Sequence, residues 1–241
     1  MTNLLLYIIR HGSPNYELDK LTEEGRKQAK ALALRLKKSG INEIYSSPLG
    51  RAYHTAQFTA SILKLNINIL PFANEDISWD CFTVQKGKNA EKDWAYRQRS
   101  LFLGKNENYT DLRDIGRGYY IDDKAKFGMD YLKKNSNEFL SRLGYEKTNF
   151  GNGYKEKEKN DKRIAIFCHQ GFALHWIAYL LNIPYHIFTA SFDISYTGVT
   201  IIKLECESTE KIAYPLCLCF CDLSHLYAEK LSMEYNECIE V

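Results

Sequence analysis

Close to its first residue the chain reads Leu4-Leu5-Leu6-Tyr7-Ile8-Ile9-Arg10-His11-Gly12, and this stretch decides the fold. A short continuous apolar run of this kind is typical of a strand buried in a parallel sheet. The run ends in a cation, an imidazole and a glycine. Open α/β sheets bind their ligands beyond the carboxyl ends of their strands. The stretch therefore predicts both a buried strand and a functional site at its end.

Two further strand endings repeat this chemistry. The apolar run 164–168 ends in His169-Gln170-Gly171, and the short strand 43–45 is followed by Ser46-Ser47-Pro48-Leu49-Gly50-Arg51. Parallel strands present their carboxyl ends at the same edge of a sheet. Two histidines and two arginines at three strand ends therefore predict one anion site of the size of a phosphate group.

The order of the remaining elements predicts the architecture. Helices are expected at 22–40 and 50–63, with strands at 43–45 and 67–70 between and after them, and this βαβαβ order favours a parallel sheet. Further helices are expected at 129–143 and 172–181, and a C-terminal β-hairpin pairs 197–204 with 212–221. The fold class is α/β: a three-layer sandwich with a mostly parallel central sheet, helices on both faces and a single domain over 1–241.

Two segments lack this periodicity. Residues 79–126 are rich in aromatic and basic side chains without a clear helix or strand pattern, and long stretches of this kind are commonly lids or substrate loops. We expect 79–126 to be a cap insertion over the strand ends. The polar run 151–162 alternates lysine with glutamate and is expected to be a solvated surface loop.

The composition excludes several classes of protein. The 32 lysines and arginines nearly balance the 30 aspartates and glutamates, which argues against a nucleic-acid partner. No stretch approaches the roughly 20 apolar residues of a membrane helix, and no signal peptide pattern precedes the first strand. We expect a cytoplasmic protein that does not bind membranes and whose seven cysteines are all reduced. The sequence does not decide between a monomer and a homodimer.

Several histidines and cysteines favour a structural role. Cys217, Cys219 and Cys221 alternate along a strand, which places all three thiols on one face. We interpret them as small buried apolar residues rather than zinc ligands. Four histidines are not expected to contact the substrate: His54 within a helix, His175 on an apolar helix, His186 before a strand, and His225, which could hydrogen-bond to a residue of the site from behind.

The strand-end residues suit phosphoryl transfer. A neutral imidazole held at a strand end can attack phosphorus, and His11 is the candidate nucleophile. Arg10 and Arg51 would disfavour its protonation and match phosphoryl oxygens with their planar donors. His169, together with the backbone N–H groups of the helix that follows it, adds further donors.

The leaving alkoxide needs a proton, so a carboxyl group is expected on a loop after a strand. Glu75 is the best placed, because the segment 74–80 follows the strand 67–70 and precedes the expected cap. Asp76 and Asp80 remain alternatives for the same role.

These motifs together resemble the histidine phosphatase (phosphoglycerate mutase-like) superfamily. The resemblance rests on the following segments, in this order: Arg10-His11-Gly12, Leu21-Thr22-Glu23-Glu24-Gly25, Ser46-Ser47-Pro48, Arg51-Ala52, Glu75 and His169-Gln170-Gly171. The C-terminal segments 197–202 and 222–225 look like its broad-specificity phosphatase branch.

The resemblance implies His11 as the phosphorylated residue, Glu75 as proton donor, and neither a metal nor an organic cofactor. It implies Arg10, Arg51 and His169 as phosphate ligands. Asn15 and Gln170 are further candidates for contact with the substrate. A phosphatase acting on a small phosphorylated substrate is the leading hypothesis. The alternatives are a mutase of the phosphoglycerate type and a regulator that binds phosphorylated ligands without turnover.

Overall fold

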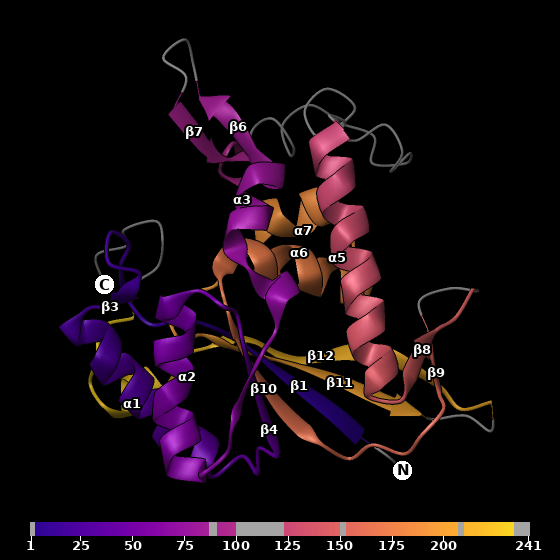
Figure 1. Cartoon of the computed structure of the whole chain (residues 1–241), viewed down its shortest axis with the longest axis horizontal. Coiled ribbons are helices and arrows are strands. Elements are labelled where there is room, and N and C mark those ends of the chain that lie inside the picture. The colour runs from indigo at the N-terminus through magenta and orange to yellow at the C-terminus, as the bar shows by residue number, and fades with distance from the viewer. Residues whose placement is uncertain (1–2, 87–90, 100–122, 150–152, 207–209, 234–241) are drawn as a thin grey trace.

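The computed structural model describes residues 3–86, 91–99, 123–149, 153–206 and 210–233 (Figure 1). Within this part no helix is long and apolar enough to cross a membrane. Most of the expected cap, and residues 151 and 152 of the expected polar loop, lie outside the described residues. The single domain over 1–241 stays a prediction.

The centre of the molecule is an eight-stranded mixed sheet with the order β5-β4-β10-β1-β11-β12-β9-β8. Its strands are β1 (Asn3–Arg10), β4 (Glu43–Ser46), β5 (Ile67–Ile69), β8 (Tyr145–Lys147), β9 (Tyr154–Glu156), β10 (Arg163–Cys168), β11 (Val199–Cys206) and β12 (Ile212–Asp222). The half from β5 to β1 is parallel. Every pairing from β1 to β8 is antiparallel.

The prediction of a mostly parallel sheet is therefore wrong for one half. β11 and β12 are consecutive strands joined by a short connection, which only an antiparallel pair allows. The remaining two strands come from segments without a strand pattern. β9 lies in the expected polar loop and has a single aromatic residue, Tyr154, which is fully buried.

Helices cover both faces of the sheet. They are α1 (Glu23–Lys37), α2 (Gly50–Leu63), α3 (Glu75–Phe82), α5 (Asp123–Arg142), α6 (Gln170–Leu181), α7 (Tyr185–Ser191) and α8 (Ser224–Ala228). α1 begins where the sequence predicts, because the Thr22 side chain accepts a hydrogen bond from the Gly25 N–H. α7 and the first six residues of α5 have no counterpart in the sequence expectations.

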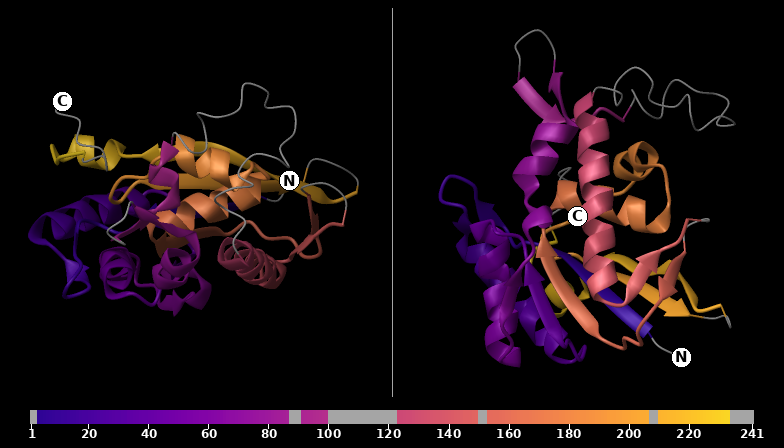
Figure 2. Two further views of the ribbon diagram at one scale, coloured as in Figure 1. Left: turned by 90° about the horizontal axis from the view of Figure 1, so that it is seen from above. Right: turned by 45° about the vertical axis from the view of Figure 1, so that its right-hand side comes forward.

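Shorter elements connect these. They are β2 (Pro14–Asn15) paired with β3 (Lys20–Leu21), the 3₁₀ turns η1 (Pro71–Ala73) and η2 (Ala95–Arg97), and β6 (Thr83–Lys86) paired with β7 (Glu91–Trp94). The pair β6–β7 projects from the end of α3 that lies farther from the sheet (Figures 1 and 2). The expected cap thus begins inside α3 and ends inside α5.

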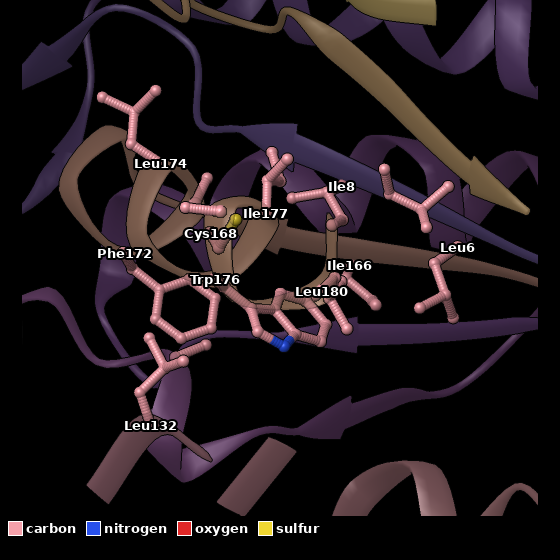
Figure 3. Packing of buried hydrophobic residues seen from close by; sticks show 14 of the residues in the cluster. Leu6, Ile8, Leu132, Ile166, Cys168, Phe172, Leu174, Trp176, Ile177 and Leu180 are labelled. Atoms are coloured by element: carbon pink, nitrogen blue, oxygen red, sulfur yellow. The ribbon is translucent and has the colours of Figure 1, made fainter. Parts of the chain in front are cut away.

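Two apolar clusters hold the layers together. Leu6 and Ile8 of β1 face a cluster formed with α5 and α6, whereas Tyr7 and Ile9 face the cluster under α1 and α2. Figure 3 shows the first cluster, in which Trp176 is fully buried. Because neighbouring residues of a strand point to opposite faces, β1 serves both cores at once.

The expected common face of the three C-terminal thiols is wrong. Cys217 pairs with Ile202, which faces the α5–α6 cluster, whereas Cys219 pairs with Ile201, which faces the other cluster. Irregular register between β11 and β12 breaks the alternation at this point. The thiols are half-buried instead of fully buried, and no disulfide joins the six cysteines that lie in the described residues.

Candidate active site

Two neighbouring parallel strands deliver both histidines to one place. Arg10 at the end of β1 is in register with Cys168 at the end of β10, and the His11 N–H donates to the Cys168 carbonyl at 2.9 Å. The rings of His11 and His169 consequently lie with their centroids 5.1 Å apart, and both are buried. The structure brings together the two histidines that the sequence singled out.

The surroundings of His11 set its protonation. Nδ1 lies 2.8 Å from the Gly12 carbonyl oxygen, which can only accept, so Nδ1 carries the proton and Nε2 carries the lone pair. Burial, followed by the charge of Arg10, holds the pKa of His11 well below its usual value. A neutral imidazole with a free Nε2 is the form that can act as a nucleophile.

His169 is oriented by Ser47. The Ser47 Oγ accepts from the Leu49 N–H and lies 2.8 Å from His169 Nε2, so the hydroxyl can donate to that nitrogen. Nδ1 of His169 then carries the proton and lies 3.4 Å from Glu75 Oε2. Burial is the main reason why the pKa of His169 is also well below its usual value.

Glu75 is on a helix and not on the expected loop. The Asn74 side chain accepts from the Asp76 N–H, and this cap starts α3 at Glu75. One oxygen of Glu75 accepts from the Gly171 N–H at 2.7 Å, at the start of α6. The alternatives Asp76 and Asp80 are exposed, so of the three acids Glu75 is the one that the structure places beside the histidines.

The surroundings of Glu75 change the pKa of its carboxyl group. Burial raises its pKa, although the nearby charges of Arg51 and Arg10 and the N–H groups of Gly171 and Phe172 oppose the rise. A carboxyl group with a raised pKa retains its proton at higher pH, as a general acid requires.

Arg51 and Arg10 are both buried beside this group. Arg51, in the first turn of α2, places Nη2 3.6 Å from Glu75 Oε2 and Nη1 2.7 Å from Asp19 Oδ1. Arg10 donates to the Ile194 carbonyl at 2.6 Å, and its guanidinium group lies 4.1 Å from the centre of the Tyr196 ring. The histidines therefore face a region with two guanidinium groups at its edge.

The two remaining predicted contacts have other partners. Asn15 is exposed in β2 and its side-chain oxygen accepts from the Leu18 N–H. The Gln170 side chain donates to Asp193. Within the described residues neither side chain contacts the two histidines or Glu75, so their roles stay predictions.

Three further residues, which no sequence pattern singled out, surround the site. Asp19 forms an ion pair with Arg51, the Tyr16 ring lies 5.4 Å from the Arg51 guanidinium group, and Tyr196 lies against both Arg10 and His11. Asp19 is separated from Arg51 by 32 positions and belongs to a segment without periodicity, so no local signal indicated the pairing.

Within the described residues the other histidines make no hydrogen bond or ring contact with His11, Glu75 or His169. His54 lies within α2, and His175 on α6 is stacked on Phe82 with 3.8 Å between ring centroids. The expected position of His186 before a strand is wrong, because His186 lies on α7 and no strand follows it directly. His225 on α8 contacts Thr197 Oγ1 at 2.9 Å, and Thr197 hydrogen-bonds through its N–H to the backbone of β1 and His11.

The electrostatics of the cluster favour an anion. His11, Glu75 and His169 each offer one atom that could bind a metal ion, and these three atoms lie within 4.8 Å of one another. However, Arg51 Nη2 contacts the same carboxylate, and the charge of Arg10 acts on all three groups. Two guanidinium groups oppose a cation and attract a phosphoryl group.

Comparison with known proteins agrees with this interpretation. Residues 6–114 match the model of the histidine phosphatase superfamily (branch 1). The "Probable phosphoglycerate mutase GpmB" of Escherichia coli is 31% identical over 93 residues, which cover 30% of this chain. The chain spans about 43% of the length of this curated relative.

Solved structures share the fold. A phosphoserine phosphatase from Entamoeba histolytica, in complex with 3-phosphoglyceric acid, aligns with a TM-score of 0.58 over 92% of this chain and 99% of its own. A mycobacterial glucosyl-3-phosphoglycerate phosphatase gives 0.57 over 92% and 99%. The α-ribazole phosphatase of Shigella flexneri gives 0.57 over 91% and 96%. Identities of 18–19% make this a likeness of fold.

Proposed function

We propose that this chain, whose residues 6–114 belong to the histidine phosphatase superfamily, hydrolyses phosphomonoesters through a phosphohistidine on His11. The observation that carries the proposal is the meeting of a neutral imidazole, a carboxyl group of raised pKa and a guanidinium group at one edge of the sheet. A nucleophile, an acid and an anion clamp are the parts that this reaction needs.

In the first step, His11 Nε2 attacks phosphorus with its lone pair, and the bond from phosphorus to the leaving oxygen breaks. Glu75 gives its proton to that oxygen, so the product leaves as a neutral alcohol. Arg10, Arg51 and the N–H of His169 Nδ1 hold the phosphoryl oxygens, where charge accumulates in the transition state.

In the second step, the Glu75 carboxylate takes a proton from a water molecule that attacks the phosphoryl group. The nitrogen–phosphorus bond breaks, and its electron pair returns to His11 Nε2. Inorganic phosphate is released, and both His11 and Glu75 recover their initial protonation states.

The test is hydrolysis of p-nitrophenyl phosphate by the wild-type chain and by His11→Ala. The variant should lose turnover, and rapidly quenched wild-type protein should carry an acid-labile, alkali-stable phosphoryl group that the variant lacks. His54→Ala is the matched control, because within the described residues no hydrogen bond, ion pair or ring contact joins His54 to His11, Glu75 or His169. Unchanged activity in His11→Ala would falsify the assignment.

A mutase is the second candidate, and the match to the GpmB protein is what favours it. A mutase keeps its phosphohistidine from water and returns the group to another hydroxyl of the same ligand. Incubation with 3-phosphoglycerate separates the two activities: phosphate release supports the hydrolase, and formation of 2-phosphoglycerate without release supports the mutase.

A regulator without turnover fits the geometry less well. That hypothesis expects the acid to point away from the phosphate site, whereas Glu75 lies 3.4 Å from His169 and 3.6 Å from Arg51. The phosphatases of similar fold are named for phosphoserine, glucosyl-3-phosphoglycerate and α-ribazole phosphate. A small phosphorylated metabolite is therefore the substrate class that we propose, and a screen of such compounds for phosphate release tests it.

A further inference from the structure

Asp19 contributes three contacts to a helix that is far from it in the sequence. It lies in the turn between β2 and β3, and its carboxylate accepts from the Gly50 N–H at 2.5 Å and from the Arg51 N–H at 3.3 Å. The same carboxylate contacts Arg51 Nη1 at 2.7 Å. One side chain therefore holds both the backbone and the guanidinium group of Arg51.

The start of α2 depends on this carboxylate. Leu49 precedes the helix and offers no side-chain hydrogen bond, and the first turn of α2 contains no acidic residue. The free N–H groups of a helix start need an acceptor, and a negative charge there is favourable. Asp19 provides both. Gly50 allows the approach, because a Cβ at that position would lie 2.3 Å from the Asp19 carbonyl oxygen.

Arg51 lies between two carboxyl groups that compete for it. Nη1 contacts Asp19 at 2.7 Å, whereas Nη2 is 3.6 Å from Glu75 Oε2, which is longer than a hydrogen bond. The Arg51 side chain is 10% exposed, and the Glu75 side chain is 13% exposed. An arginine and a carboxylate in such surroundings attract each other strongly and favour a two-pronged contact.

We infer that Asp19 is a positioning residue, which rests on the proposed function: it holds Arg51 open for the phosphoryl group and keeps it from closing onto Glu75. A closed Arg51–Glu75 pair would occupy the donors that the phosphoryl oxygens need. It would also stabilise the carboxylate form of Glu75, which cannot supply a proton. Asp19 thereby serves both the anion clamp and the acid without touching the substrate.

The effect on Glu75 has to be separated from the other charges around it. The groups that act on Glu75 are Arg51 from α2, Arg10 and His11 from the end of β1, Cys168 and His169 from the end of β10, and Tyr96 from η2. Replacement of Asp19 leaves all of these in place. Asp19 itself is not among the charges that act on Glu75, so a change in the titration of Glu75 reports the altered position of Arg51.

Asp19→Asn removes the charge with little disturbance of the backbone. Asp19 has φ of 47°, in the left-handed region that asparagine tolerates well, and the asparagine oxygen can still cap α2. We expect kcat/KM for p-nitrophenyl phosphate to fall about ten- to hundredfold, the usual worth of a hydrogen bond between charged groups. The alkaline limb of the pH profile should move to lower pH, because a closer Arg51 lowers the pKa of Glu75.

A double-mutant cycle tests whether Asp19 acts through Arg51. Asp19→Asn combined with Arg51→Gln should lose no more activity than Arg51→Gln alone, since the group that Asp19 positions is already absent. Glu146→Gln is the matched control, because it breaks the Lys157–Glu146 pair of 2.8 Å at the β8 edge of the sheet. That control should retain the wild-type pH profile.

The inference is overturned if Asp19→Asn keeps kcat/KM within threefold of the wild type with an unmoved alkaline limb, or if the cycle shows additive losses. Asp19→Asn keeps the cap of α2, and it is measured at a temperature where circular dichroism shows the variant folded. Calorimetric binding of inorganic phosphate keeps the outcome separate from the proposed hydrolysis. A wild-type chain without turnover would contradict the phosphatase, whereas weaker phosphate binding by Asp19→Asn would still support the positioning role.

Discussion

The protonation of two side chains decides when this site can work. His11 must be neutral to attack, and burial beside Arg10 lowers its pKa, so activity should rise as pH increases through that lowered value. Glu75 must hold its proton, and burial raises its pKa, so activity should fall as pH increases through that raised value. The expected profile of kcat/KM is a bell whose acidic limb belongs to His11 and whose alkaline limb belongs to Glu75.

Glu75→Gln should abolish the part of the fall in kcat/KM at high pH that is caused by ionisation of the enzyme. The exposed neighbour Asp76 offers a matched control, and Asp76→Asn should keep both limbs. Ionisation of the substrate contributes equally to both variants, so it cancels in the comparison. Survival of the alkaline limb in Glu75→Gln would assign the proton donor to another group.

Single residues at strand ends could be predicted because each follows a recognisable apolar run. His11, His169 and Arg51 were found in this way, and the structure places all three around Glu75. Asp19 follows no such run, since its partner Arg51 is 32 residues away in the sequence. Contacts between distant segments without periodicity leave no trace in a single sequence.

At the level of elements, prediction succeeded where several periodic residues act together. α2 spans Gly50–Leu63 as expected, and α6 differs by two residues at its start. β8 and β9 have three residues each and are held by pairing along the sheet instead of by an apolar pattern. Elements of this length depend on their neighbours for stability, which explains why the sequence did not indicate them.

The start of α6 offers a test of how elements support the site. The Gly171 N–H donates to Glu75, and a Cβ at Gly171 would lie 2.3 Å from the Trp94 ring. Gly171→Ala should cost about 1–3 kcal/mol of unfolding free energy through overpacking and should also lower kcat, because the shifted backbone releases Glu75.

Gly153→Ala provides the comparison, since its Cβ would lie 2.4 Å from Ile212 near the far edge of the sheet. Denaturant unfolding and kcat, measured on both variants at a temperature where both are folded, separate stability from catalysis. Equal kcat values for the two variants would show that the Gly171 contact does not support Glu75.

The whole molecule should unfold as one unit, because β1 contributes side chains to the cores on both faces of the sheet. Leu32→Ala on the α1 side should lower the free energy of unfolding by about 2–5 kcal/mol. Trp79, Trp94 and Trp176 all belong to or pack against the opposite core, so tryptophan fluorescence reports that face. The fluorescence transition should therefore shift together with the transition seen by circular dichroism.

Leu34→Ala serves as the control for this experiment, because Leu34 is 43% exposed on the same helix and should change stability by less than about 0.5 kcal/mol. A fluorescence transition that stays in place while the circular dichroism transition moves would indicate two independent units. That result would replace the expected single domain by two.

The position of β1 also governs the order in which the chain can assemble during synthesis. β1 is flanked by β10, which begins at Arg163, and by β11, which begins at Val199. During synthesis β1 therefore finds its first hydrogen-bonding neighbour only after the whole segment from Arg10 to Arg163 has followed it, and its second neighbour later still. Late closure of this kind slows folding and exposes an apolar segment meanwhile, so the nascent chain is a natural client for chaperones.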